Sequence, residues 1–205
     1  LTLTYALTPS QLGFTVASAL IGTIAGAALA GIPGQRIGRR DSLLIMAVLY
    51  VVSAIGCALA WNWYALLAFR LIGGLGIGGS SVLGPMYIAE IAPAKWRGRL
   101  VGTFQINIVG GILLAYMSNF FIATFHLGMV EWRWQLGVAA VPAVLFLLLL
   151  LTIGRSPRWL VMKSRIDEAR KSLLRTGVPD REAELQDIVA SVHLDRQATT
   201  ESLFS

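Results

Sequence analysis

The feature that most constrains the fold of this sequence is a series of long apolar runs without any charged residue. The first 35 residues contain no Asp, Glu, Lys or Arg. As a helix, the run 12–32 would be about 31 Å long, which matches a hydrocarbon core of roughly 30 Å. Hydrophobic residues make up 56% of the chain and its mean hydropathy is +0.68, above the roughly 45–50% apolar content of soluble domains. The sequence therefore predicts an all-α membrane protein.

Short charged or aromatic segments divide the apolar sequence into five expected membrane helices. The Trp61-Asn62-Trp63 element is typical of an aromatic belt at the membrane surface and of a short turn, although its indoles can alternatively be ordinary core aromatics. We expect residues 1–11 to be an extracytoplasmic leader, residues 12–154 to hold the membrane helices, and residues 155–205 to form cytoplasmic amphipathic helices. The expected spans are 12–32, 43–60, 64–90, 99–124 and 135–153.

The formal net charge of +6 comes mainly from basic turns between the spans. Residues 155–205 hold 9 of the 17 Lys and Arg and 8 of the 11 Asp and Glu, a net of +1, so the other +5 belongs to residues 1–154. Counting alternate connections, one side of the membrane carries Arg133 and the other carries the remaining basic turns, which the positive-inside rule places in the cytoplasm. Because these turns share no single solvated face, we expect no nucleic-acid partner. The basic side holds Arg36, Arg39, Arg40, Lys95, Arg97, Arg99, Arg155 and Arg158.

Small residues recur at helical spacing in two of the expected spans. Gly22, Gly26 and Ala30 repeat every four residues, and Gly74 and Gly78 do the same. This spacing lets helices approach closely in a membrane. The segment 74–79 also satisfies the letters of the GxGxxG dinucleotide motif, but that motif follows a strand in a soluble βαβ unit. We therefore expect these glycines to pack helices and not to bind a nucleotide.

Arg70 is a single cation inside the third expected span, with no other ionisable residue from 71 to 89. An arginine near the centre of a membrane helix costs about 2.5 kcal/mol or more. It can pair with a carboxylate beside a water-filled path, or its long side chain can extend to the nearer membrane surface. The sequence around it supplies no acid.

The fourth expected span carries amides on one face. Gln105, Ile112 and Asn119 are spaced by seven residues and share that face, whereas Asn107 points about 200° away from Gln105. Such an amide either bonds another helix or binds a ligand in a cavity. The chain has no nucleophile–base pair and no metal-ligand cluster, and Cys57 is its one cysteine. We therefore expect neither an enzyme nor a cofactor.

The C-terminal segment reads as short amphipathic helices against the ends of the spans. Ser156 and Pro157 suit an N-cap and a first helical residue, and the turn 177–179 separates two helical patterns. At roughly 50 residues with a thin core, this segment is not expected to fold alone. The apolar positions are Ile166, Ala169 and Leu173 in the first helix, and Leu185, Ile188, Val189 and Val192 in the second.

Five motifs, taken in order, resemble the sugar porter branch of the major facilitator superfamily. They read GIPGQRIGRRD, RLIGGLGIG, PMYIAEIAPAKWRGR, WRWQLG and SPRWL. The resemblance implies part of the N-terminal helix bundle of a twelve-helix transporter, with helices two to six followed by short cytoplasmic helices. Its partners would then be a first helix and a C-terminal half outside this chain, the lipid bilayer of the plasma or inner membrane, and a sugar-like small molecule.

The resemblance also implies roles for particular residues. Gln105 matches a glutamine that hydrogen-bonds sugar hydroxyls, and Ile112 stands where some sugar–proton symporters have a second glutamine. Arg70 matches an arginine that pairs with an aspartate on the first helix of proton-coupled members. The residues that match the cytoplasmic gate and its charge cluster are Gly31, Arg36, Gly38, Arg39, Arg40, Glu90, Arg97, Arg155 and Arg158.

Two positions depart from the family pattern at this gate. Gln35 stands where the gating loop usually has an aspartate, and Arg155 stands where PESPR has its glutamate. Both changes remove acids, so we expect the arginines to share chiefly Glu90 and Asp41. Either the closed gate is then weakened, or anionic lipid headgroups replace the missing acids.

The sequence as a whole predicts a fragment of a transporter for a sugar or a similar polyhydroxylated solute, working by alternating access, with proton coupling left open. The alternative is a membrane sensor or structural protein that reuses the fold without transport.

Overall fold

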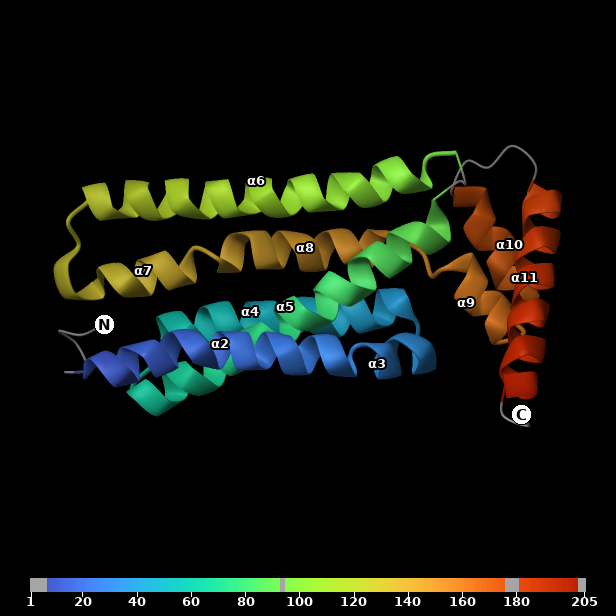
Figure 1. The fold of residues 1–205 in the computed structure, drawn as a ribbon. Helices are drawn as coiled ribbons and strands as arrows, with labels where there is room; N and C mark the ends of the chain where they lie inside the picture. The colour runs from blue at the N-terminus through green and yellow to red at the C-terminus, as the bar shows by residue number, and fades with distance from the viewer. Residues whose placement is uncertain (1–6, 93–94, 176–180, 203–205) are drawn as a thin grey trace.

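The computed structural model describes residues 7–92, 95–175 and 181–202, and within these ranges its regular elements are all helices, with no strand. This confirms the predicted all-α class. Figure 1 labels the elements in chain order. They are α2 (Pro9–Leu29), α3 (Gly31–Arg36), α4 (Arg39–Ala58), α5 (Trp63–Ile91), α6 (Arg97–Thr124), the 3-10 turn η1 (Gly128–Val130), α7 (Glu131–Gly137), α8 (Ala140–Thr152), α9 (Pro157–Met162), α10 (Ile166–Arg175) and α11 (Arg181–Ser202).

Five helical segments of the described chain are long and apolar enough to cross a membrane. They begin earlier than the sequence suggests, and in two of them a polar side chain caps the first turn. Thr8 accepts a hydrogen bond from the Gln11 amide at 3.4 Å and Pro9 takes the first helical position, while Asn62 accepts from Ala65 at 2.7 Å. The segments are Pro9–Arg36, Arg39–Ala58, Trp63–Ile91, Arg97–Thr124 and Gly128–Thr152.

Two expected bounds differ from the helices. Within the expected leader 1–11, Pro9 already belongs to α2, and residues 1–6 lie outside the described residues. The expected span 135–153 lies almost wholly within the membrane-length segment Gly128–Thr152, in which a break at Val138 and Ala139 separates α7 from α8. Pro142 explains the break: it has no N–H to donate to the carbonyl four residues earlier, and its ring crowds that carbonyl.

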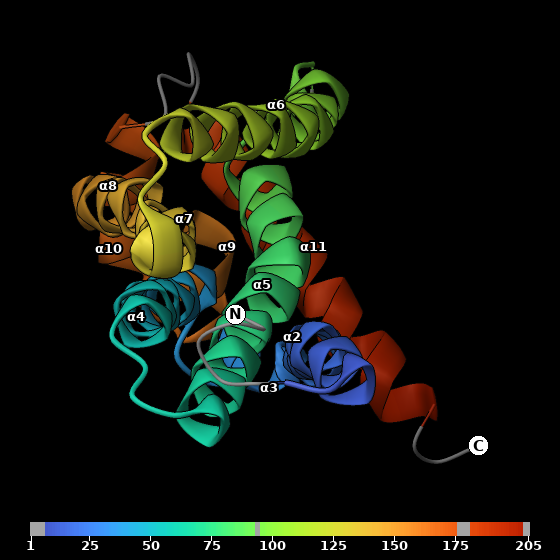
Figure 2. The same cartoon turned by 90° about the vertical axis from the view of Figure 1, so that its left-hand side faces the viewer.

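The membrane-length helices pack around α5. Seen end-on, α5 lies between α2 and α4 (Figure 2), and α8 packs on the other side of α4. The buried core between α4, α5 and α8 includes Leu43, Met46, Leu83, Tyr87 and Leu150. Helix α6 contacts α5 and α7, yet none of its residues is buried. Helix α6 therefore forms an open wall of the bundle.

Glycine lets α2 and α5 meet backbone to backbone, as the sequence pattern predicts. A Cβ atom added at Gly22 would lie 3.0 Å from the Cα of Gly74, and one added at Gly26 would lie 2.8 Å from the Cα of Leu75. At Gly78 it would lie 2.6 Å from the backbone nitrogen of Ala27. Real Cβ atoms do not come so close to a backbone that cannot move aside. The stretch 74–79 lies inside helix α5, so its glycines pack helices.

A second glycine face of α5 packs against α4. A Cβ atom at Gly73 would lie 3.0 Å from the Cβ of Ser53, and one at Gly76 would lie 3.2 Å from the backbone oxygen of Met46. The high glycine content of α5 therefore follows from its position between two close neighbours.

Arg133 fastens α7 to the end of α4. Its guanidinium donates to the carbonyl oxygens of Ala58 at 2.9 Å and Ala60 at 3.0 Å, and it stacks over the Trp132 ring at 4.7 Å from the centroid. A cation at the last carbonyls of a helix is favoured by the helix dipole. This contact closes the end of the bundle at which α4 turns into α5.

Helices α9, α10 and α11 lie across the other end of the bundle, as Figure 1 shows. Ser156 accepts from the Trp159 amide at 3.4 Å and Pro157 starts α9, which confirms the predicted cap. Ile166 is 37% exposed and lies outside the core of these helices. The predicted turn 177–179 lies outside the described residues. The buried apolar residues of these helices are Trp159, Leu160, Val161, Ala169, Leu173, Leu185 and Val192, with Ile188 and Val189 packed against them.

The glycine contact between α2 and α5 gives a direct test with a matched control. We expect Gly78→Ala to lower the free energy of unfolding by about 1–3 kcal/mol, the usual cost of forcing atoms into a packed interior. Gly110→Ala on α6 should be neutral, because a Cβ there meets nothing within 4 Å. Thermal unfolding of the purified chain in detergent measures both variants, and equal melting temperatures would contradict the backbone-to-backbone contact.

Candidate functional site

Helix α6, the open wall of the bundle, carries Gln105, Ile112 and Asn119 on one face, which we call the amide face. Gln105 is exposed, and no described group hydrogen-bonds its amide. Ile112, two turns further along, is 53% exposed. The side-chain oxygen of Asn119 is buried and has no hydrogen-bond partner among the described residues. The wall therefore presents a free amide and an apolar residue beside each other on one face of a membrane helix.

Arg70 lies half-buried in α5, and its Nε atom is buried without a hydrogen-bond partner within the described residues. No carboxylate in that part of the chain forms an ion pair with it. The described residues therefore do not supply the carboxylate that was expected to pair with Arg70. A buried, unpaired guanidinium nitrogen in a membrane helix is energetically costly, so this site favours an acidic or polar partner from another segment.

A charge cluster joins the ends of α4 and α5 at the basic end of the bundle. Gly38 has φ of +98°, a left-handed conformation that suits glycine, and it turns the chain from α3 into α4. The next residue, Arg39, is buried and donates from Nε to Glu90 at 3.0 Å. Its Nη1 also donates to the carbonyl oxygen of Gly34. One arginine thus connects α3, α4 and α5.

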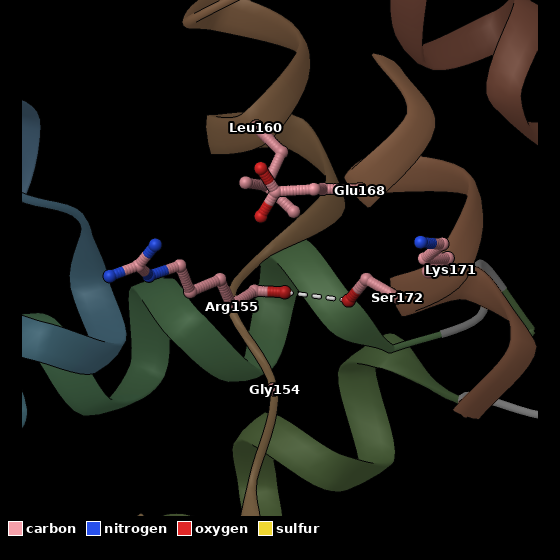
Figure 3. A pocket seen from close by; sticks show the side chains of 6 residues that line it. All are labelled: Gly154, Arg155, Leu160, Glu168, Lys171 and Ser172. Carbon is pink, nitrogen blue, oxygen red and sulfur yellow. Dashed lines mark hydrogen bonds between the residues drawn. The ribbon is translucent and has the colours of Figure 1, made fainter. Parts of the chain in front are cut away.

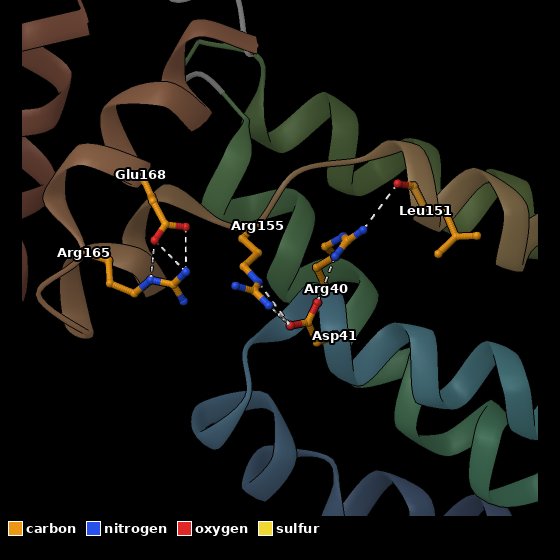
Figure 4. Close-up of polar contacts among 6 residues, drawn as sticks. All are labelled: Arg40, Asp41, Leu151, Arg155, Arg165 and Glu168. Carbon is orange, nitrogen blue, oxygen red and sulfur yellow. Dashed lines mark hydrogen bonds and ion pairs between the residues drawn. The ribbon is translucent and has the colours of Figure 1, made fainter.

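Asp41 is shared by two arginines from distant parts of the chain. Arg155 donates to its Oδ2 from Nη2 at 2.8 Å and from Nε at 3.1 Å. Arg40 donates to its Oδ1 at 3.1 Å and to the carbonyl oxygen of Leu151 at 3.3 Å. Figure 4 shows Arg40 and Arg155 converging on this carboxylate while Arg165 pairs separately with Glu168. Arg155, which replaces an acid in the family motif, is therefore neutralised by Asp41.

Trp159 seats α9 against the turn between α3 and α4. Its indole Nε1 donates to the carbonyl oxygen of Gln35 at 3.2 Å, and its ring lies 3.0 Å from the place a Cβ of Gly38 would occupy. On the other side of the junction, the Tyr87 hydroxyl donates to the Gly154 carbonyl at 2.7 Å. Sequence reasoning missed both contacts. The tryptophan of SPRWL was a signal for the first, but nothing local to Tyr87 identifies its partner.

The structure brings together some of the residues that match the gate motifs. Gly38, Arg39, Arg40, Glu90 and Arg155 form the cluster just described. Arg36 and Arg97 are exposed and form no ion pair within the described ranges, although Arg97 donates to the Ala92 carbonyl at 3.5 Å. Gly31 lies at the start of α3, where a Cβ would meet nothing within 4 Å. Arg158 is half-buried in the first turn of α9.

A small hollow of about 190 Å³ lies beside this cluster, between α9 and α10 (Figure 3). Ser172 lines the hollow, and its hydroxyl donates a hydrogen bond to the Arg155 carbonyl oxygen at 2.6 Å. The residues that line the hollow are far in sequence from the amide face of α6. Among the described residues, no group of three or more His, Cys, Asp or Glu could hold a metal ion. The residues around the hollow are Gly154, Arg155, Leu160, Glu168, Lys171 and Ser172.

Comparison with known proteins identifies the family of this chain. The family model described as "Sugar (and other) transporter" matches residues 3–205. The chain belongs to this transporter family. The match confirms the resemblance carried by the five sequence motifs, and with the five apolar helices it shows a multi-pass membrane protein.

Two relatives within the transporter family are named for D-xylose. The chain is 40% identical over 187 residues to a D-xylose transporter of Levilactobacillus brevis, a match of 90% of this chain and 40% of that protein. It is 44% identical over 182 residues to the D-xylose-proton symporter of Escherichia coli (strain K12), a match of 78% of this chain and 37% of the symporter.

Solved transporter structures share the fold of this chain. The partially occluded inward-open xylose transporter XylE from E. coli has a TM-score of 0.84 at 40% identity over 90% of this chain. The proton:xylose symporter XylE bound to 6-bromo-6-deoxy-D-glucose has a TM-score of 0.88 at 38% identity, covering 97% of this chain and 47% of that one. The chain therefore spans less than half the length of these relatives.

The shared carboxylate of Asp41 gives the second test. We expect a double-mutant cycle of Asp41→Asn and Arg155→Gln to give a coupling energy of about 0.5–1 kcal/mol, because the Arg155 side chain is 38% exposed and water screens the pair. Asp41→Asn alone should cost more than Arg155→Gln, since it leaves two arginines without their acid.

The control for this cycle is Arg165→Gln, which removes an exposed pair with Glu168 within a single turn. It should change stability by a few tenths of a kcal/mol at most. Detergent-solubilised unfolding monitored by circular dichroism supplies all the free energies. A coupling energy of zero would show that Asp41 and Arg155 do not interact in solution.

Proposed function

We propose that this chain is part of a transporter that moves a sugar or a similar polyhydroxylated solute across the cell membrane by alternating access. The observation that carries the proposal is the free amide of Gln105 on the open wall of α6. An amide both donates and accepts hydrogen bonds, which suits a ligand made of hydroxyl groups. The names of the pentose-transporting relatives support the same class of solute.

Binding within the proposed path depends on a few polar contacts. Gln105 would hydrogen-bond the sugar, while Ile112 on the same face would pack against its apolar ring face and offer no hydrogen bond. Ligand sites of this kind combine an apolar lining with a small number of placed polar groups. The part of the wall opposite α6 would come from the rest of a longer protein, since the chain covers 47% of a related transporter.

Proton coupling is the role we propose for Arg70. Its buried Nε atom has no partner among the described residues. A carboxylate from another helix of the full transporter would pair with it and, on protonation, release it. The names of two relatives, a D-xylose-proton symporter and an arabinose-proton symporter, support coupling of this kind.

We propose that the charge cluster at the basic end is half of a cytoplasmic gate. The ion pairs of Arg39 with Glu90 and of Arg155 with Asp41 hold α4, α5 and the start of α9 together. This end would face the cytoplasm, with α9 to α11 as the cytoplasmic helices, because it carries the basic turns. The other residues proposed for the gate by resemblance are Gly31, Arg36, Gly38, Arg40, Arg97 and Arg158.

The alternating-access proposal fits a rigid half that moves as one body. Transporters of this type rock one helix bundle against another around a central site. The backbone contacts of α5 with α2 and α4 would keep this half rigid, and the ion pairs would make and break at its end. In this role the chain binds a solute and does not catalyse a reaction.

The role of Gln105 can be tested with a neighbouring amide as the control. In the full-length transporter we expect Gln105→Ala to weaken D-xylose binding and uptake about tenfold, the effect of one lost hydrogen bond and an unpaired hydroxyl. Asn107→Ala removes the same kind of group from another face of α6 and should change both by less than about twofold.

Equilibrium binding and proteoliposome uptake of radiolabelled D-xylose are the measurements. Unchanged binding and uptake in Gln105→Ala would exclude the proposed sugar contact. Binding without any uptake by the unaltered protein would instead support a sensor that reuses the transporter fold.

A further inference from the structure

The two basic turns of this chain differ in how their charges are neutralised. At the turn into α4, Arg39 pairs with Glu90 and Arg40 pairs with Asp41, and only Arg36 forms no ion pair with a described residue. In the turn before α6, three cations lie within five residues, and in the described part of the chain none of them forms an ion pair. The sequence from 91 to 130 contains no acid. The cations are Lys95, Arg97 and Arg99, and all three are exposed.

A tryptophan lies within the same basic turn. Trp96 is 46% exposed, and the guanidinium carbon of Arg99 lies 5.1 Å from the centre of its ring. Tryptophan is enriched at the level of lipid headgroups, because its ring has one apolar and one polar end. The cation–π contact keeps the charge of Arg99 at the same level as the indole.

Lipid-facing apolar surface begins directly after this turn. Leu100 is 43% exposed and Ile106, further along α6, is 71% exposed, and both lie off the face that carries Gln105. The turn therefore lies where α6 passes from the polar membrane surface into the hydrocarbon core. The cations and the indole of residues 95–99 come first along the chain and exposed apolar side chains follow, which matches the order of a phospholipid's headgroup and acyl chains.

We propose that the patch formed by Lys95, Trp96, Arg97 and Arg99 binds anionic phospholipids through their phosphate headgroups. Clustered Lys and Arg beside a membrane helix attract anionic lipid, and each cation near the surface strengthens binding by about fivefold. An anionic lipid fits better than an acidic protein segment because the patch continues into lipid-facing apolar surface. The proposal goes beyond sugar transport and does not depend on it.

The test compares two lipids with identical acyl chains. The purified chain in detergent is titrated with phosphatidylglycerol and with phosphatidylcholine, and bound lipid is counted by native mass spectrometry. We expect a preference for phosphatidylglycerol, which Lys95→Gln combined with Arg99→Gln should reduce roughly 30-fold. The single variant Lys95→Gln should reduce it about fivefold and serves if the double variant does not fold.

Three controls separate this site from general electrostatics. Lys163→Gln combined with Lys171→Gln removes the same charge from exposed positions on the short helices and should leave the preference unchanged. Lys95→Arg combined with Arg99→Lys keeps the charge and should also keep the preference. Inorganic phosphate added to the titration should not displace the lipid.

Three results would overturn the proposal. One is an unchanged phosphatidylglycerol preference in the Lys95 and Arg99 double variant. The second is an equal loss of preference in the Lys163 and Lys171 control. The third is displacement of the lipid by inorganic phosphate, which would identify the patch as a site for free phosphate.

Discussion

The close approach of α2 and α5 is the contact on which the rest of this structure depends. Lipid tails are as apolar as leucine, so no hydrophobic force drives these helices together and contact between their surfaces must hold them. Gly22, Gly74 and Gly78 remove side chains where the two backbones meet. With α5 fixed against α2, its other glycine face receives α4, and α4 in turn supports α8. Helix α6 does not share in this packing, so its amide face stays open.

Charged residues connect helices at the two ends of the bundle and not in its middle. At one end, Arg133 binds the last carbonyls of α4. At the other, Arg39 and Asp41 tie the helix ends to Glu90 and Arg155. Arg70 is the exception, because it lies inside α5 with a buried nitrogen that no described group satisfies. We propose that this cation takes part in proton coupling.

Features that depend on local spacing could be predicted from the sequence. The glycine repeats identify the surfaces of α2 and α5 that meet, and Ser156 with Pro157 identifies the start of α9. Contacts between distant residues could not be predicted in detail, because a charge does not specify its partner: Asp41 binds Arg155, 114 positions away. The break before α8 could have been inferred from Pro142, yet an uninterrupted apolar run suggested a continuous span. The candidate sugar contact Gln105 was found through its helical spacing and through the family resemblance, whereas the contacts of Trp159 and Tyr87 needed the structure.

Our central proposal is that the side chain at position 105 faces the transported sugar. Protection of a cysteine at this position from a maleimide reagent by the sugar tests the proposal directly. In the full-length transporter with Cys57→Ser, a cysteine introduced by Gln105→Cys would be treated with a water-soluble maleimide in the presence and absence of D-xylose. We predict that the cysteine reacts and that D-xylose slows its reaction, whereas a cysteine from Asn107→Cys gains no such protection. A reaction rate at position 105 that saturating D-xylose leaves unchanged, in a protein that still transports it, would contradict the account.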